Sequence, residues 1–232
     1  MQRCLQPELL DELPAGDPQA VRSRADLRRI NRLMGQARIL AQAMAPGRRQ
    51  NPLQQVVELG AGDGTGLLRF ARHLARYGHT PEAQLVDQQD LLTPATRRAF
   101  SGLGWKVQAV QADVFEWLAR PATTRSDLLV ANLFLHHFSE PQLRELFRRA
   151  TERTNLLLAC EPRRSPLALT AARLLGLIGC NAITRHDAVV SVRAGFSAGE
   201  LSALWPTPDR WELIEKPAGW FSHCFIAKRL GL

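Results

Sequence analysis

The sequence of 232 residues has few cysteines and no long apolar run, and both absences narrow its class. Its four cysteines are too few for a disulfide scaffold, and none shows the Cys-x-x-Cys spacing typical of zinc sites. No apolar run reaches the roughly 18 residues of a membrane span, and the acidic, proline-interrupted start does not resemble a secretory signal. We therefore expect a reduced, cytoplasmic protein with no membrane span and no bound metal.

Lysine is also scarce, although the chain is strongly basic. The formal net charge is +8, yet only three of the 30 basic residues are lysines. A basic chain raises nucleic acid or an anionic surface as a partner. The arginines are dispersed and form no single tract, so an arginine-rich genomic composition explains them better. Nucleic acid is therefore a disfavoured partner.

The pattern of apolar residues divides the chain near residue 50. Residues 1–50 predict an N-terminal helical segment that begins at Asp17-Pro18 and ends at Pro46-Gly47. This arginine-rich segment is a solvated basic face, a lid over an anionic ligand, or an edge that meets an acidic partner. In residues 51–232, short apolar runs alternate with helical stretches, which predicts one α/β domain with helices on both faces of a mostly parallel sheet.

The expected elements of this domain follow from those runs. Five strands are expected at residues 54–60, 83–87, 105–110, 126–132 and 155–160. A long helical region is expected over residues 166–204, including a helix at 197–205, before a hairpin of strands at 211–216 and 221–229 around Pro217-Ala218-Gly219.

The most informative segment is a glycine-rich loop after the first expected strand. Residues 56–66 read Val-Val-Glu-Leu-Gly-Ala-Gly-Asp-Gly-Thr-Gly. Ligands of open α/β sheets bind beyond the carboxyl ends of the strands, and glycines let a ligand approach the backbone. The dinucleotide fingerprint fails because Thr65 or Leu67 stands where its third glycine would be, and no Gly-Lys-Ser/Thr of a P-loop follows. The loop therefore predicts a nucleotide-like ligand without a diphosphate.

This loop resembles motif I of the class I S-adenosylmethionine-dependent methyltransferases, without a gap over residues 56–64. The resemblance implies S-adenosylmethionine as cofactor, with Glu58 near its ammonium group. It also implies a Rossmann-like fold with seven strands in the order 3-2-1-4-5-7-6, the seventh antiparallel. The loop residues that would contact the methionyl portion and the ribose are Gly60, Ala61, Gly62 and Gly64.

Two more acids follow the second and third expected strands. The resemblance assigns Asp87 to the ribose hydroxyls, which a carboxylate can accept, and places Gln88 beside the adenine. The alternative for Asp87 is a surface turn. Asp113 and the backbone of Val114 would meet the adenine, although Asp113 also suits a helix N-cap and can fill both roles. Asn132, at the end of the fourth strand, completes the expected cofactor set.

The fourth strand runs into Asn132-Leu-Phe-Leu-His-His-Phe. Methyltransferases of nucleic-acid bases usually carry Asp/Asn-Pro-Pro-Tyr/Phe here, so the departure favours a small-molecule acceptor. The segment resembles ubiquinone/menaquinone and natural-product methyltransferases, some of which use a histidine here as general base. Methyl transfer needs alignment and removal of the acceptor proton, which suits histidine. We expect a catalytic pair of His137 and Glu161, with His136 as the second candidate for the base. The alternative stays open that alignment of acceptor and cofactor suffices and no general base is used.

The sequence therefore predicts an S-adenosylmethionine-dependent methyltransferase (EC 2.1.1) acting on a small molecule. A looser similarity to methyltransferases found beside polyketide synthases, at residues 26–35, 186–196 and 219–225, implies a phenolic or polyketide-like acceptor. Oxygen is favoured over carbon or nitrogen as the methylated atom. The alternatives are an RNA or other macromolecule methyltransferase and a non-catalytic module that keeps the fold. Whether the chain forms a homodimer stays open.

Overall fold

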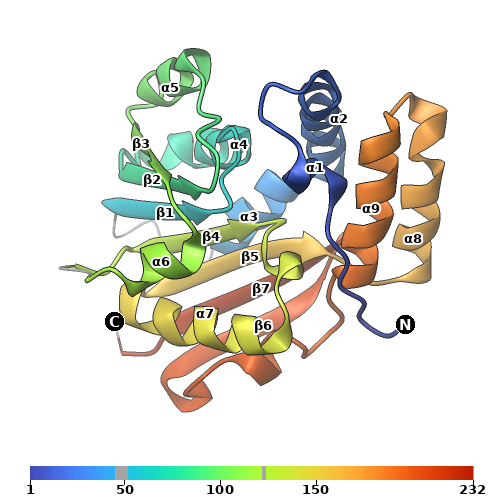
Figure 1. Ribbon diagram of the computed structural model, residues 1–232. Coiled ribbons are helices and arrows are strands. Elements are labelled where there is room, and N and C mark those ends of the chain that lie inside the picture. The colour runs from blue at the N-terminus through green and yellow to red at the C-terminus, as the bar shows by residue number, and fades with distance from the viewer. Residues whose placement is uncertain (45–51, 122–123, 232) are drawn as a thin grey trace.

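The computed structural model describes residues 1–44, 52–121 and 124–231, and a seven-stranded sheet forms its centre (Figure 1). The strand order is β3-β2-β1-β4-β5-β7-β6. The first five strands pair in parallel, whereas β7 is antiparallel to both neighbours, β5 and β6. This confirms the expected topology. The strands are β1 Gln55–Leu59, β2 Glu82–Asp87, β3 Lys106–Gln111, β4 Leu128–Asn132, β5 Leu156–Pro162, β6 Trp211–Ala218 and β7 Ser222–Arg229.

Helices cover both faces of the sheet, because side chains alternate along each strand. Val56 and Leu128 belong to the apolar cluster under α3, α4 and α5, whereas Val57 and Leu129 belong to the cluster under α6 and α7. Besides the helices over these two clusters, α8 and α9 form a third group and pack against each other beyond β5 (Figure 1). The helices of these groups are α3 Gln36–Met44, α4 Thr65–Leu74, α5 Pro94–Ser101, α6 Val114–Ala119, α7 Glu140–Arg153, α8 Pro166–Arg173 and α9 Ala182–Ala194.

The N-terminal segment is helical, as expected, but it is divided. After a short α1 (Leu9–Glu12), helix α2 (Pro18–Met34) begins at a capping Asp17, whose side chain accepts the backbone N–H groups of Gln19 and Ala20. Gly35, at φ 68°, ends α2 in the left-handed conformation before α3 starts. The expected end at Pro46-Gly47 and the boundary at residue 50 lie outside the described residues.

The region after β5 differs from the expected long helix. Gly179, at φ 80°, separates α8 and the 3₁₀ turn Leu174–Ile178 from α9. The expected helix at 197–205 is wrong: apart from the 3₁₀ turn Ser202–Leu204, the segment is irregular. Gly199 has a positive φ, and the Glu215 carboxylate accepts the backbone N–H groups of Leu201 and Ser202, so it replaces helical partners. The hairpin of β6 and β7 is confirmed.

Residues 1–12, which we call the strap, cross the carboxyl side of the sheet beside α9 (Figure 1). The Arg3 guanidinium donates to the carbonyls of Ala194, His136 and Phe138. Asp187 of α9 accepts the backbone N–H groups of Leu9 and Leu10. The strap is therefore held by polar contacts at both ends. None of the described helices is long and apolar enough to cross a membrane.

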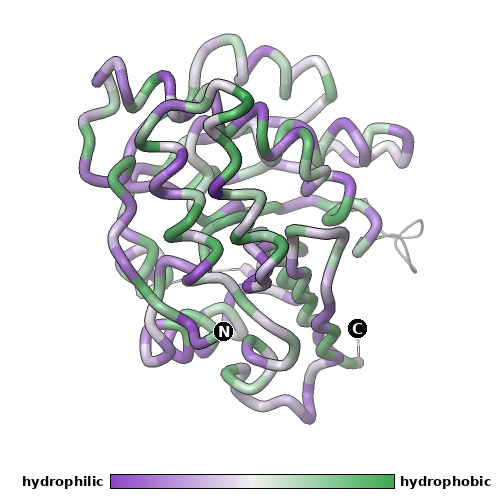
Figure 2. Tube along the Cα trace, turned by 90° about the vertical axis from the view of Figure 1, so that its right-hand side faces the viewer, coloured by the Kyte–Doolittle hydropathy of each residue, from purple (hydrophilic) through white to green (hydrophobic). Residues whose placement is uncertain are grey.

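Hydrophobic and hydrophilic residues are mixed along helices α8 and α9 (Figure 2), and α9 packs against α8, α2 and β5. Their inner sides form a small apolar cluster with Ala168, Ala172 and Val192. Where α9 ends, Gly195 brings the chain against the backbone of β5. A Cβ atom built on Gly195 would lie 2.2 Å from the carbonyl oxygen of Pro162.

We therefore predict that Gly195→Ala lowers the free energy of unfolding by about 1–3 kcal/mol, because the methyl group clashes with a fixed carbonyl. Urea unfolding followed by circular dichroism measures this. The control is Gly16→Ala, where a Cβ meets nothing among the described atoms within 4 Å. Equal effects of the two substitutions would contradict the packing argument.

Candidate active site

A cavity of about 610 Å³ lies at the carboxyl ends of the parallel strands, between the sheet and helices α2, α8 and α9. This volume is typical of sites for small molecules. One end is lined by the glycine loop and the ends of β1 and β2. The other end is walled mainly by apolar side chains of α2, α8 and α9. Its apolar lining residues include Leu27, Ile30, Met34, Ala171, Ala172, Leu175, Ile178, Val192 and Phe221.

The glycine loop contributes to the cavity unevenly. Gly60, Ala61 and Gly62 line it, as expected. Gly62 has a positive φ, and a Cβ there would meet no described atom within 4 Å, so its backbone is open to a ligand. Gly64 does not line the cavity; its Cβ would lie 2.9 Å from Cδ1 of Leu85. Gly64 therefore serves packing beneath the loop.

Two buried oxygen atoms at the base of this end lack a partner. Neither Oε2 of Glu58 nor Oδ1 of Asn132 has a hydrogen bond within the described part of the chain, and both residues line the cavity. Burial, followed by the nearby charges of Asp63 and Asp87, raises the pKa of Glu58 well above its ordinary value. The pair forms an acceptor site suited to a cationic group.

The other expected cofactor residues hold the loops in place. Asp87 accepts the backbone N–H of Gly62 at 2.8 Å and that of Gln89 at 2.9 Å. It lines the cavity together with Gln88 and Val114. Asp113 does not line it. Its carboxylate caps α6 and accepts a hydrogen bond from Nε2 of Gln88 at 3.3 Å. The N-cap alternative for Asp113 is thus confirmed.

Glu161 shapes the loop that follows β4. This buried carboxylate accepts the backbone N–H groups of Phe134 and Leu135 through Oε1, at 3.0 and 2.9 Å. Its Oε2 lies 2.7 Å from Nδ1 of His136. The expected pairing of Glu161 with His137 is therefore wrong. The 3₁₀ turn Leu135–His137 directs His136 toward the sheet and leaves His137 at the cavity.

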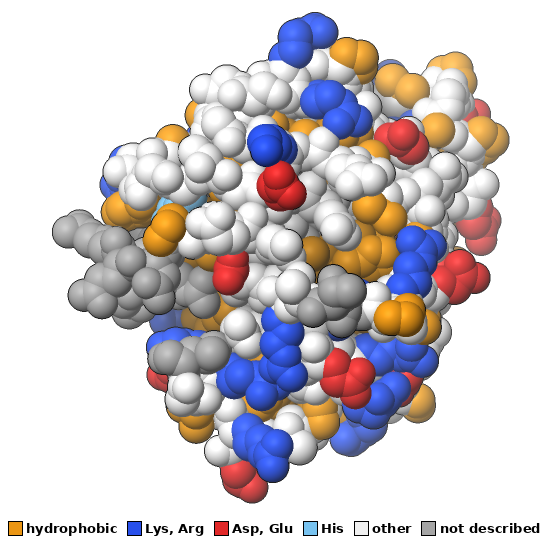
Figure 3. All heavy atoms as spheres, turned by 90° about the vertical axis from the view of Figure 1, so that its left-hand side faces the viewer, with side chains coloured by type: hydrophobic (Ala, Val, Ile, Leu, Met, Phe, Trp, Pro, Cys, Tyr) orange, Lys and Arg blue, Asp and Glu red, His pale blue; other side chains and the backbone are white. Residues whose placement is uncertain are grey.

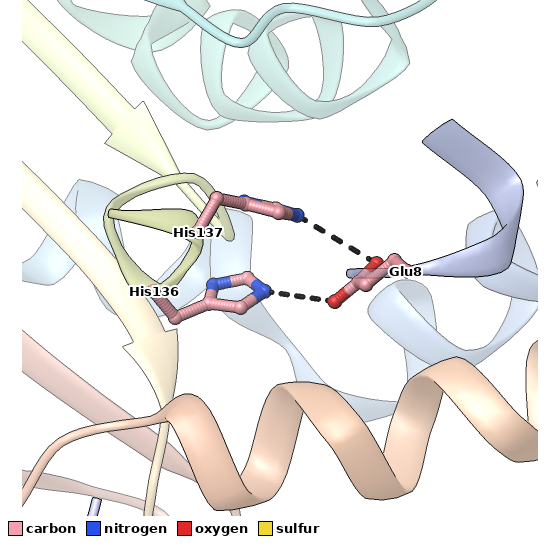
Figure 4. A group of neighbouring side chains, drawn as sticks. All are labelled: Glu8, His136 and His137. Carbon is pink, nitrogen blue, oxygen red and sulfur yellow. Dashed lines mark hydrogen bonds and ion pairs between the residues drawn. The ribbon is translucent and has the colours of Figure 1, made fainter. Parts of the chain in front are cut away.

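The two imidazoles have different surroundings but converge on one carboxylate (Figure 4). His137 is held through Nδ1 by the Phe134 carbonyl at 3.0 Å, and its Nε2 lies 3.6 Å from Oε2 of Glu8. Nε2 of His136 lies 3.3 Å from Oε1 of Glu8. Burial lowers the pKa of His136, but hydrogen bonds with Glu161 and Glu8 outweigh it and raise the pKa to about 9.

Glu8 is the functional candidate that the sequence did not reveal. The strap brings it to the histidines, where the Ser191 hydroxyl also donates to Oε1. Burial raises the pKa of Glu8, but both histidines lower it more, so the carboxylate is charged. Asp11 lies beside it, with Oδ2 3.6 Å from Nε2 of His137. No sequence signal marks these acids, because 128 residues separate Glu8 from His136.

Two of the arginines make contacts within the fold. Arg28 of α2 pairs with Asp63 of the glycine loop at 2.9 Å. Arg164 is buried and donates to the Gly195 carbonyl and to Glu200. On the face shown in Figure 3, acidic side chains lie among the Lys and Arg side chains. Arg28 and Arg164 are therefore engaged by groups of this chain itself.

Glu58 gives a stability prediction. Its folded-state pKa is raised above that of the unfolded chain, so the folded state loses stability as pH rises from about 4.5 through the raised value. Glu58→Gln removes this ionisation. We expect the variant to gain on the order of 1–3 kcal/mol over the parent at pH 8 and less at pH 5. Urea unfolding at both pH values measures the difference, with the exposed Glu82→Gln as control. If the free energies of unfolding of the parent and of Glu58→Gln change with pH in the same way, this interpretation is wrong.

Comparisons with known proteins agree with the fold and the loop. A methyltransferase domain family matches residues 56–155. The plantazolicin methyltransferase BpumL is 12% identical at a TM-score of 0.64, over 92% of this chain and 91% of that chain. An O-methyltransferase family protein from Burkholderia thailandensis is 19% identical at a TM-score of 0.58, over 93% and 61%. Magnesium protoporphyrin IX methyltransferase from Synechocystis PCC 6803 is 13% identical at a TM-score of 0.53, over 88% and 93%.

No curated protein matches the sequence. The three solved structures named above are at most 19% identical to this chain, so they bear on the fold alone, whereas the family match covers the segment from β1 to α7 that carries the glycine loop. The glycine loop, the strand order and the family match lead to the same result: the chain has the fold of the class I S-adenosylmethionine-dependent methyltransferases, and its residues 56–155 match a methyltransferase domain family.

Proposed function

We propose that this protein transfers the methyl group of S-adenosylmethionine to an oxygen atom of a small, largely apolar acceptor of phenolic or polyketide-like kind. The observation that carries the proposal is one continuous cavity with two unlike ends. A polar end with unpaired acceptors lies at the glycine loop, and an apolar end reaches His137. A cofactor and an acceptor can therefore lie in line within it.

The polar end fits the cofactor. The unpaired Oε2 of Glu58 and Oδ1 of Asn132 would accept the ammonium group of the methionyl portion. Each Asp87 oxygen accepts one backbone N–H and keeps a lone pair for a ribose hydroxyl. Gln88 and the backbone of Val114 would lie beside the adenine. Two structural neighbours, BpumL and the protoporphyrin enzyme, were solved with S-adenosylhomocysteine, which supports this assignment.

The apolar end supports a flat, greasy acceptor. Its walls are mainly Leu, Ile, Ala, Met and Phe side chains, and polar groups gather at Glu8, His136 and His137. An acceptor hydroxyl would therefore be drawn to the histidine end, while its apolar body contacts α2, α8 and α9. One structural neighbour is an O-methyltransferase family protein, which supports oxygen as the methylated atom.

His137 is the general base in this proposal. The Phe134 carbonyl accepts the proton on its Nδ1, so the lone pair of Nε2 faces the cavity. As the acceptor oxygen attacks the methyl carbon, the C–O bond forms, the C–S bond breaks and S-adenosylhomocysteine leaves. The acceptor proton passes to Nε2 of His137. His136 is less suited because it is buried and held charged between two carboxylates, so it and Glu161 position the loop.

The test is methyl transfer from isotopically labelled S-adenosylmethionine to a panel of phenols and hydroxylated polyketides. We predict that His137→Gln lowers kcat about 10²–10³-fold on the best acceptor and leaves the Kd for S-adenosylmethionine unchanged. His73→Gln, at an exposed position of α4, is the matched control. If kcat of the His137 variant equals that of the control, alignment alone drives the reaction and the base is wrong.

A further inference from the structure

The geometry points to a second use of the histidine end: we propose that His136, His137 and Glu8 bind one divalent transition-metal ion. One ligand atom from each of these residues lies within 4.8 Å of the others. Figure 4 shows both imidazole rings directed at the two oxygen atoms of Glu8. In the part of the chain that the structure describes, no other group of three His, Cys, Asp or Glu side chains gathers in this way.

The orientation of the rings is the first argument. Metal-bound histidines usually donate their second ring nitrogen to a carboxylate or a backbone carbonyl, which fixes the tautomer and aims the free nitrogen at the ion. Both forms occur here. Nδ1 of His136 is held by Glu161 at 2.7 Å, and Nδ1 of His137 by the Phe134 carbonyl at 3.0 Å. Nε2 of His137 therefore presents a lone pair, and Nε2 of His136 becomes a ligand when the incoming ion displaces its proton.

The spacing is the second argument. Two ligands that are each about 2.0–2.1 Å from a tetrahedral ion lie about 3.4 Å apart. Nε2 of His136 lies 3.3 Å from Oε1 of Glu8, and Nε2 of His137 lies 3.6 Å from Oε2. Oδ2 of Asp11 lies 3.6 Å from Nε2 of His137, but its side chain is 63% exposed and stays outside the set of three ligands. The three ligand atoms lie within 4.8 Å of one another, so rotations of the side chains would bring them around one ion.

The ligand types and the charge select the ion. Two imidazoles with a carboxylate suit Zn²⁺, Fe²⁺, Co²⁺ or Mn²⁺, whereas Mg²⁺ and Ca²⁺ prefer sites made of oxygen atoms. Three carboxylates, of Glu8, Asp11 and Glu161, surround the two imidazoles. A divalent cation balances this excess of negative charge better than one imidazolium does.

The role of the ion rests on the proposed function. With three protein ligands, the ion keeps an open position at the acceptor end of the cavity. The acceptor hydroxyl binds there, and its oxygen loses the proton to solvent because coordination lowers its pKa. The resulting oxyanion attacks the methyl carbon, and S-adenosylhomocysteine leaves as before. In the metal-free protein Nε2 of His137 takes the same proton; in the metal-bound protein that lone pair is occupied and the ion replaces the base.

The experiment measures metal binding without turnover. The full chain, stripped with a chelator, is titrated calorimetrically with Zn²⁺, Co²⁺ and Mg²⁺, and the d–d absorption of bound Co²⁺ is recorded. We expect one Zn²⁺ or Co²⁺ per chain, Mg²⁺ binding at least tenfold weaker, and a tetrahedral Co²⁺ spectrum. Glu8→Gln should weaken Zn²⁺ binding at least tenfold, whereas Glu12→Gln, at an exposed acid of the same strap, should not.

Two results would overturn the site: no stoichiometric binding, or equal affinities of the Glu8 and Glu12 variants. Thermal unfolding of each stripped variant shows whether it is folded. Methyl transfer with and without chelator separates the two proposals. A chain that binds no metal but methylates phenols refutes the metal site and keeps the proposed function. A chain that binds Zn²⁺ through Glu8 but methylates no hydroxyl keeps the site and refutes the acceptor class.

Discussion

The Glu161 carboxylate is the contact on which the whole acceptor end depends. It is fully buried at the end of β5 and accepts the backbone N–H groups of residues 134–136 as well as the imidazole of His136. A buried carboxylate that lost these donors would be strongly destabilising, so the loop has one arrangement. Leu133, at φ 55°, is held in an unfavourable backbone conformation directly before it. The strap depends on the same loop, because Arg3 binds the carbonyls of His136 and Phe138.

Most of the strands and helices could be predicted from patterns of neighbouring residues in the sequence. The apolar runs and the glycine loop each depend on neighbouring residues, so they predicted the strands directly, whereas the strand order and the cofactor contacts came from the resemblance to a methyltransferase family. The helix expected at 197–205 failed because Glu215, from another strand, accepts its N–H groups. The prediction that His137 pairs with Glu161 failed for a similar reason. The 3₁₀ turn decides which imidazole contacts Glu161, and Glu8 comes from the strap, which is distant in sequence.

Some of the arginines have a structural role within the molecule. Arg3 and Arg164 donate to backbone carbonyls around β5 and the end of α9, and Arg28 ties α2 to the glycine loop. A guanidinium offers five donors in a fixed plane, so one side chain can satisfy several carbonyls that no helix or strand pairs. These arginines join segments far apart in the chain. The basic composition is thus partly structural, and it does not require an anionic polymer as partner.

The strap is held less firmly than the sheet and its helices. None of its residues is buried. Its anchors are hydrogen bonds that Arg3 donates to a carbonyl, that the backbone of Leu9 donates to Asp187, and that the Ser191 hydroxyl donates to Glu8. The sheet and its helices are instead held by two large apolar clusters. Detachment of the strap exposes little apolar surface, so its free energy is far smaller than that of global unfolding. Glu8 therefore sits on a segment that can open before the sheet does, so its contacts with the two histidines can be lost while the rest of the protein stays folded.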